Sequence, residues 1–107
     1  MALVGHSFGG AVAISAGVLR NEVIAVCPLS SQTYGAAQVK NLSPKPVLFI
    51  HGSADEILPD TCSISLYQLS GEPKELVLYP GCRHGLDECR DRLDQDLLSW
   101  LRKILIR

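Results

Sequence analysis

The chain has 107 residues, 47% of them hydrophobic and 20% charged, which suits a single globular domain over residues 1–107 and excludes a disordered chain. Ten basic residues against eleven acidic ones give a net charge of −1, and no basic cluster occurs that would bind nucleic acid. No apolar run approaches the roughly 20 residues that span a membrane, so we expect a cytoplasmic protein without membrane contact.

Apolar runs alternate along the chain with helical patterns, which predicts βαβ units. We therefore expect an α/β fold with a parallel sheet of about four strands, flanked by helices. Strands are predicted at Ala2–Val4, at Glu22–Cys27, where Pro28 ends the strand, at Val47–His51 and at Glu75–Tyr79. Helices are predicted at Gly9–Leu19, in one short segment within Ser30–Leu42, at Pro59–Leu69 and from Leu86 onward.

The last predicted helix is amphipathic. Leu86, Leu93, Leu97, Leu101 and Ile104 recur at helical spacing, with charged residues between them. We expect the apolar face of this helix to cover the sheet, since helices on parallel sheets have this pattern. The alternative is a helix that binds a partner protein.

The four cysteines of the chain show no metal-binding or disulfide pattern. No two of them form a Cys-x-x-Cys pair, and their density is far below that of a disulfide-rich secreted domain. We therefore expect free thiols, with no metal site and no cofactor. The cysteines are Cys27, Cys62, Cys82 and Cys89.

The first chemical motif is Gly-His-Ser-Phe-Gly-Gly, in which Ser7 has a glycine two positions to either side, Gly5 and Gly9. A strand is predicted before it and a helix after it, which is the setting of a nucleophile elbow. Side chains at the two glycines would collide with neighbouring backbone, and the strained turn would raise the serine hydroxyl above the sheet. The amide of Phe8 would then face a developing oxyanion. The alternative is a glycine-rich turn that binds phosphate.

A serine hydroxyl needs a base, and the chain has three histidines. His6 adjoins Ser7 in a tight turn and is expected to point elsewhere. His51 ends a strand and is interpreted as a structural residue. His84 lies in the glycine-rich turn Pro-Gly-Cys-Arg-His-Gly after the fourth strand, at the same sheet edge as Ser7, and is the predicted base.

The base needs an orienting carboxylate, and Asp55 follows the third strand at that edge. Its neighbour Glu56 is the rival, although adjacent turn residues face different ways. The alternative is that both are solvated loop residues before a helix. The order Ser7, Asp55, His84 along the chain is the order found in α/β-hydrolases.

With these three motifs the whole chain resembles the C-terminal half of an α/β-hydrolase. Its GHSFGG is similar to the nucleophile elbow of that family, its HGSADEILP to the acid loop and its PGCRHG to the histidine loop. The resemblance implies a serine hydrolase for a small ester, thioester or amide, with Ser7 as nucleophile, His84 as general base and acid, Asp55 as orienting carboxylate and the Phe8 amide as an oxyanion donor. The short segment Pro28–Pro46 has no room for a lid, which resembles the dienelactone-hydrolase-like members.

The family takes its second oxyanion donor from a loop after an earlier strand, which has no counterpart here. The strand at Ala2–Val4 would also have an unpaired edge, which favours self-association. We therefore expect a fragment, a start at an internal methionine, or one half of a two-chain or dimeric assembly. The alternative function is a hydrolase-derived interaction module without turnover, which needs a partner chain.

Overall fold

The computed structural model of the protein describes residues 1–106 and contains a four-stranded parallel sheet in the order β1-β2-β3-β4. Each strand therefore pairs with the next strand along the chain, as predicted from the βαβ pattern. The strands are β1 (Ala2–His6), β2 (Ala25–Leu29), β3 (Val47–Gly52) and β4 (Lys74–Tyr79). The helices are α1 (Phe8–Leu19), η1 (Ala37–Asn41), α2 (Thr61–Leu69), η2 (Asp87–Cys89) and α3 (Arg90–Leu105).

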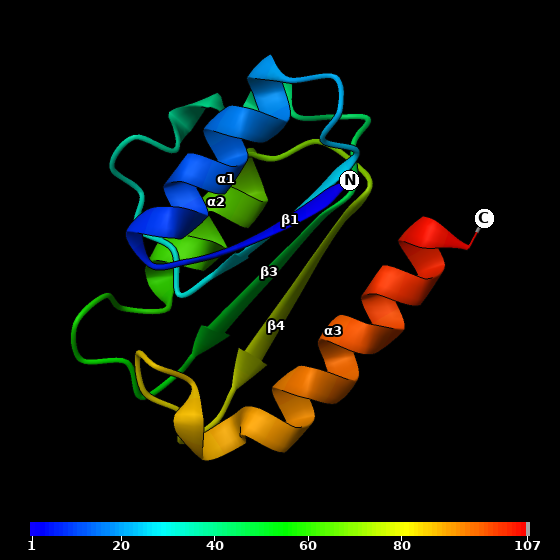
Figure 1. Ribbon diagram of the computed structural model, residues 1–107. Coiled ribbons are helices and arrows are strands. Elements are labelled where there is room, and N and C mark those ends of the chain that lie inside the picture. Colours follow the sequence, from blue (N-terminus) through cyan, green and yellow to red (C-terminus); the bar gives the residue numbers. More distant parts are fainter. Residues whose placement is uncertain (107) are drawn as a thin grey trace.

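Helices cover both faces of the sheet, with α1 and α2 on one face and α3 on the other (Figure 1). Two apolar clusters result. Ile14, Phe49 and Leu66 belong to the cluster under α1 and α2, whereas Ile50 and Trp100 belong to the cluster under α3. Because successive strand residues point to opposite faces, neighbouring residues of β3 serve different clusters. The amphipathic helix α3 thus packs on the sheet as expected.

The two central strands, β2 and β3, are buried along their whole length. Pro28 lies inside β2, so the prediction that it ends the strand is wrong. Val26 and Ser30 donate their amides to carbonyls on the β3 side, and Pro28 falls midway between them in the same alternation. The sheet therefore omits one hydrogen bond at Pro28 and continues beyond it.

Cys82 and Cys89 form a disulfide, so the prediction of free thiols is wrong for these two residues. The turn after β4 brings their Cα atoms to 6.0 Å, within the range that a disulfide needs, and a spacing of seven residues does not reveal this closure. Cys27 and Cys62 are free thiols. Burial raises the pKa of the Cys27 thiol, which makes it unreactive.

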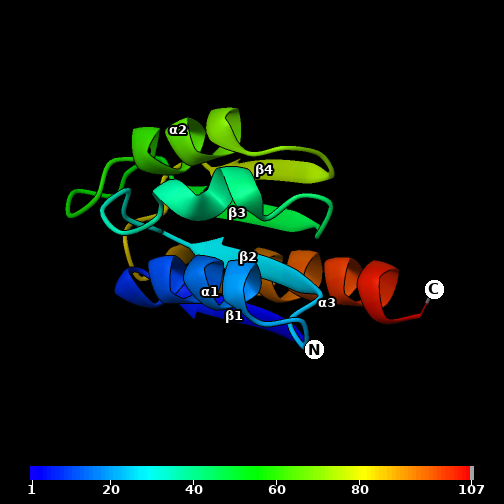
Figure 2. The ribbon, with the colours of Figure 1, turned by 90° about the horizontal axis from the view of Figure 1, so that it is seen from above.

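All four strands run in the same direction, so the loops that follow them gather at one edge of the sheet. In Figure 1 the arrowheads of β3 and β4 mark this edge, and the turn from β1 to α1 lies at the same end of the molecule. The first residue and the end of α3 lie at the opposite end (Figure 2). Within residues 1–106 none of the helices combines the length and the hydrophobicity required to cross a bilayer.

Candidate active site

Ser7 occupies the sharp turn between β1 and α1. Its backbone has φ 59° and ψ −119°, a conformation that costs a residue with a side chain on the order of 1–3 kcal/mol. The Ser7 amide donates to Leu29 O at 2.8 Å, which ties the turn to the end of β2. Although Ser7 stands at the N-cap position, its hydroxyl makes no capping bond to α1. The hydroxyl is therefore left for a partner in another loop.

The glycines around Ser7 have different environments. A Cβ at Gly5 would lie 2.0 Å from Gly9 O, so no side chain fits there, as predicted. A Cβ at Gly9 would meet nothing within 4 Å, so the prediction of crowding at Gly9 is wrong. Gly9 faces outward from the first turn of α1. Gly10 faces inward instead, where a Cβ would lie 2.9 Å from the Ser31 side chain.

His84 lies in the loop after β4 and contacts both other predicted residues. Its Nε2 is 2.9 Å from Ser7 Oγ, and its Nδ1 is 2.8 Å from Asp55 Oδ2. Because a carboxylate can only accept, Nδ1 carries the proton, and Nε2 is free to accept from the serine hydroxyl. The structure therefore brings Ser7, His84 and Asp55 together in one hydrogen-bonded row.

Asp55 is held by its own loop. Its side chain is buried, and Oδ1 accepts hydrogen bonds from the amides of Ile57 and Leu58 at 2.9 and 2.8 Å. Desolvation by burial alone would raise the pKa of Asp55, but the Leu58 amide, the His84 ring and the Ile57 amide outweigh it and lower that pKa. The carboxylate form is thus favoured. The rival Glu56 is exposed.

His51 also contacts the acid, a role that the sequence interpretation did not give it. It lies within β3, fully buried, with Nε2 at 3.1 Å from Asp55 Oδ2 and 2.8 Å from Leu58 O. Its Nδ1 is 2.7 Å from Ser63 Oγ on α2. The four-residue spacing between His51 and Asp55 across a glycine turn is the signal that could have indicated the contact.

Two side chains from other strand ends fix the backbone of His84. His6 Nε2 donates to His84 O at 2.8 Å, and Ser30 Oγ donates to the same carbonyl at 3.0 Å. The rings of His6 and His84 lie 5.0 Å apart. His6 thus bonds the histidine loop, and Ser30, which has φ 49° at the end of β2, is a further site residue that the sequence did not indicate.

The N-terminus of α1 supplies polar and apolar groups next to Ser7. Phe8 is the first residue of the helix, so its amide has no intrahelical acceptor and lies at the positive end of the helix dipole. The exposed Phe8 ring borders a pocket of about 210 Å³ with a mainly apolar lining. The pocket is lined by Phe8, Ala11, Val12, Ser15, Tyr34 and Gly35.

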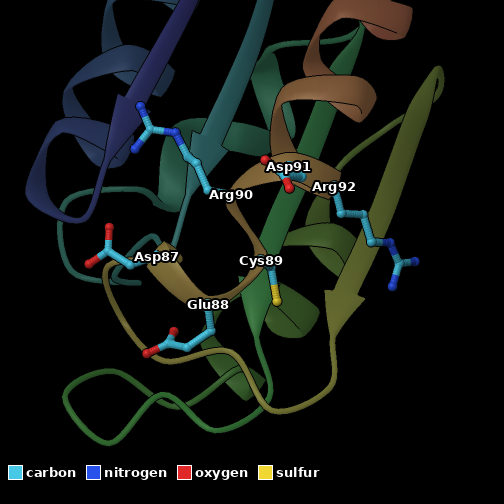
Figure 3. Close-up of a pocket in the computed structure, with 6 residues that line it drawn as sticks. All are labelled: Asp87, Glu88, Cys89, Arg90, Asp91 and Arg92. Carbon is cyan, nitrogen blue, oxygen red and sulfur yellow. The ribbon is translucent and has the colours of Figure 1, made fainter.

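A second cavity, of about 450 Å³, lies where η2 leads into α3. Figure 3 shows that its charged side chains diverge, with Arg90 and Arg92 extending in opposite directions. Cys89 in this cavity is engaged in the disulfide. Within the described part of the chain no three His, Cys, Asp or Glu side chains are grouped to hold a metal ion. The candidate site is therefore the row at Ser7.

Comparison with known proteins gives partial matches in sequence. No family model matches the chain. A stretch of 58 residues, 54% of this chain, is 43% identical to the uncharacterized protein YfhR of Escherichia coli, and 57 residues are 39% identical to the uncharacterized protein PA2218 of Pseudomonas aeruginosa. These stretches span 20% and 14% of the two relatives. The chain thus matches only a small part of the curated relatives.

Solved structures match almost the whole chain. The esterase domain of a Rhodothermus marinus protein superimposes with a TM-score of 0.85 at 20% identity, over 94% of this chain and 60% of that one. Est1E of Butyrivibrio proteoclasticus, with ferulic acid bound, gives 0.85 at 20% identity, over 99% and 60%. An α/β-hydrolase from a lagoon-sediment metagenome gives 0.81 at 20% identity, over 96% and 61%. The chain therefore has the fold of the α/β-hydrolases and corresponds to about three fifths of the length of these structures.

Proposed function

We propose that the protein is a serine hydrolase that cleaves a small ester, thioester or amide through Ser7, His84 and Asp55. The observation that carries the proposal is the continuous row from Ser7 Oγ through His84, at 2.9 Å, to Asp55 Oδ2, at 2.8 Å. A serine, a base and an orienting acid at these distances can activate a hydroxyl for attack on a carbonyl. The hydrolase fold of the chain supports the same reaction class.

In the proposed reaction Ser7 Oγ attacks the substrate carbonyl, and His84 Nε2 takes the hydroxyl proton of Ser7 in the same step. The Phe8 amide donates to the oxyanion, and His84 then delivers the proton to the leaving group, which leaves an acyl group on Ser7. Water, activated by the same histidine, releases the acid and restores the serine. The buried Asp55 carboxylate stabilises the imidazolium in both steps, and the apolar pocket beside Phe8 is the proposed place for the acyl or alkyl part of the substrate.

A fluorophosphonate probe tests this proposal, because it reacts only with an activated serine. We expect the wild-type chain to be labelled at Ser7 and to hydrolyse p-nitrophenyl acetate, and Ser7→Ala to lose both. Ser99→Ala, at an exposed serine on α3, is the control and should retain both. Labelling that survives Ser7→Ala would contradict the assignment.

The open edge of β1 favours a second candidate, an interaction module that associates with a second chain. In residues 1–106 the strand β1 pairs only with β2, and Val4 on it is exposed. Sedimentation velocity over a concentration series should then show self-association, which Val4→Lys reduces because a charge on an edge strand opposes pairing. Leu98→Lys, at an exposed leucine of α3, is the control. A monomer at all concentrations would exclude self-association.

A further inference from the structure

Asp55 is the centre of a longer row of side chains than the three proposed catalytic groups. On one side it bonds His84, which bonds Ser7, and on the other side it faces His51, which bonds Ser63. The acid thus has a histidine and a serine on each side. Only the half of the row that ends at Ser7 reaches the proposed substrate site.

The half of the row that ends at Ser63 is completely buried. His51 and Ser63 have no exposed surface, and the Asp55 side chain between the histidines has none either. The Leu58 carbonyl lies 2.8 Å from His51 Nε2 and can only accept, so Nε2 carries a proton. In the neutral ring Nδ1 then accepts from the Ser63 hydroxyl at 2.7 Å. The Leu58 carbonyl therefore selects the tautomer that points an N–H at Leu58 and Asp55, and the Ser63 hydroxyl satisfies the other ring nitrogen.

We propose that His51 is a positioning residue that fixes the Asp55 carboxylate for its bond to His84, and that Ser63 fixes His51. The inference rests on the proposed function, because it concerns the acid of that site. His51 Nε2–H lies close to both Leu58 O and Asp55 Oδ2, so it holds the strand end, the acid loop and the carboxylate oxygen that His84 uses.

The Asp55 carboxylate has two oxygens, and different groups bond each of them. The Leu58 and Ile57 amides bond only Oδ1, so apart from His84 itself they leave Oδ2, the oxygen that His84 uses, to be held by another group. His51 Nε2 lies 3.1 Å from Oδ2 itself, so its N–H adds a direct hold on that oxygen. A misplacement of about 1 Å in a reacting arrangement costs on the order of 100-fold in rate, so this contact affects turnover without touching substrate.

Two substitutions at His51 separate positioning from packing. Gln carries an N–H the same number of bonds from the backbone as Nε2, whereas Leu carries none. We expect His51→Leu to lower kcat on the order of 100-fold with KM unchanged, and His51→Gln to restore most of the loss. Phe49→Leu is the matched control, because it removes a buried ring from the same strand and the same face of the sheet, two residues before His51, at a side chain that does not bond Asp55. It should lower stability and leave kcat near wild type.

Ser63 gives a weaker version of the same test. Ser63→Ala should lower kcat less than His51→Leu, because the ring keeps its contacts with Leu58 O and Asp55 Oδ2 and loses only the hydrogen bond at Nδ1. Ser70→Ala is its control, since Ser70 is also a buried hydroxyl but bonds Leu66 O at the far end of α2. It should leave kcat unchanged.

A nuclear magnetic resonance readout decides the inference even if the chain has no turnover. The His84 Nδ1 proton in the bond to Asp55 should give a resolved signal that persists in wild type, His51→Gln and Phe49→Leu. In His51→Leu it should shift and exchange faster with solvent. Absence of labelling in a wild-type chain that shows this pattern contradicts the proposed function alone. If His51→Leu matches Phe49→Leu in this signal, the positioning role is wrong.

Discussion

The turn that carries Ser7 and the loop that carries His84 reach the same site but are held in different ways. The serine turn is held by close backbone packing within a few residues, with no room for a side chain at Gly5. The histidine loop is held within its own segment by the Cys82–Cys89 disulfide and across the fold by the hydrogen bonds from His6 and Ser30 to His84 O. Apart from the hydrogen bond of the Ser7 amide to Leu29 O, the serine turn depends on packing among neighbouring residues, whereas the histidine loop depends on three strand ends.

This difference predicts how each segment responds to substitution. In the serine turn the backbone at Gly5 packs directly against the backbone at Gly9, so a methyl group added at Gly5 disrupts the turn and the start of α1 together. In the histidine loop several bonds share the task, so the loss of any one of them should loosen His84 without unfolding the sheet. Substitutions in the two segments should therefore differ in whether global stability or local order falls first.

The largest expected effect is at Gly5. A Cβ there would lie 2.0 Å from Gly9 O, which is backbone and cannot move aside without displacing α1. We expect Gly5→Ala to lower the free energy of unfolding by about 3 kcal/mol or more, measured by urea denaturation with the fluorescence of the buried Trp100.

Gly9→Ala is the matched control for Gly5→Ala. A Cβ at Gly9 meets nothing within 4 Å, and alanine is the better helix former by up to about 1 kcal/mol. Stability should therefore stay level or rise. Equal destabilisation by the two substitutions would show that the serine turn is not held by local packing.

The next effect is the loss of the disulfide in the histidine loop. By the chain-entropy model, closing a loop of this length stabilises the fold by about 2.5 kcal/mol. We expect Cys89→Ser to lose about that amount and to speed amide hydrogen exchange across residues 80–89. Cys62→Ser, at a free and partly exposed thiol, should change neither. Unchanged exchange in Cys89→Ser would mean that the hydrogen bonds to His84 O hold the loop alone.

The sequence predicted best what local pattern determines. The four strands, the helix after Ser7 and the amphipathic α3 follow from periodicity, and Gly5 follows from the elbow motif. The crowding expected at Gly9 was wrong, because the outward face of a helix turn cannot be told from its inward face by the glycine alone. The prediction that Pro28 ends its strand was wrong, because β2 continues to Leu29 and lacks only the one hydrogen bond that the Pro28 nitrogen cannot donate.

Contacts between strand ends that are far apart in the sequence could not be predicted from local sequence patterns. The alignment of Ser7, Asp55 and His84 was an expectation from chain order, and their distances come from the fold. The contact of Ser30 with His84 depends on how the loops after β2 and β4 meet. The Cys82–Cys89 bond depends on how the segment after β4 folds back, which a spacing of seven residues does not reveal. His51 is intermediate, because its fixed distance from Asp55 is local but its contact with Ser63 depends on where α2 packs.

The smallest effect expected is at Ser30, where two substitutions separate backbone from side chain. Ser30 has φ 49°, which glycine adopts freely, and its hydroxyl donates to His84 O at 3.0 Å. Ser30→Ala loses the hydrogen bond, at about 1 kcal/mol, and keeps the strain, whereas Ser30→Gly loses the bond and relieves the strain. Both should speed hydrogen exchange in residues 80–89 equally, although Ser30→Gly should be the more stable by about 1 kcal/mol. If exchange instead followed stability, the loop would be held by the general rigidity of the sheet edge, and the contrast between the two segments would fail.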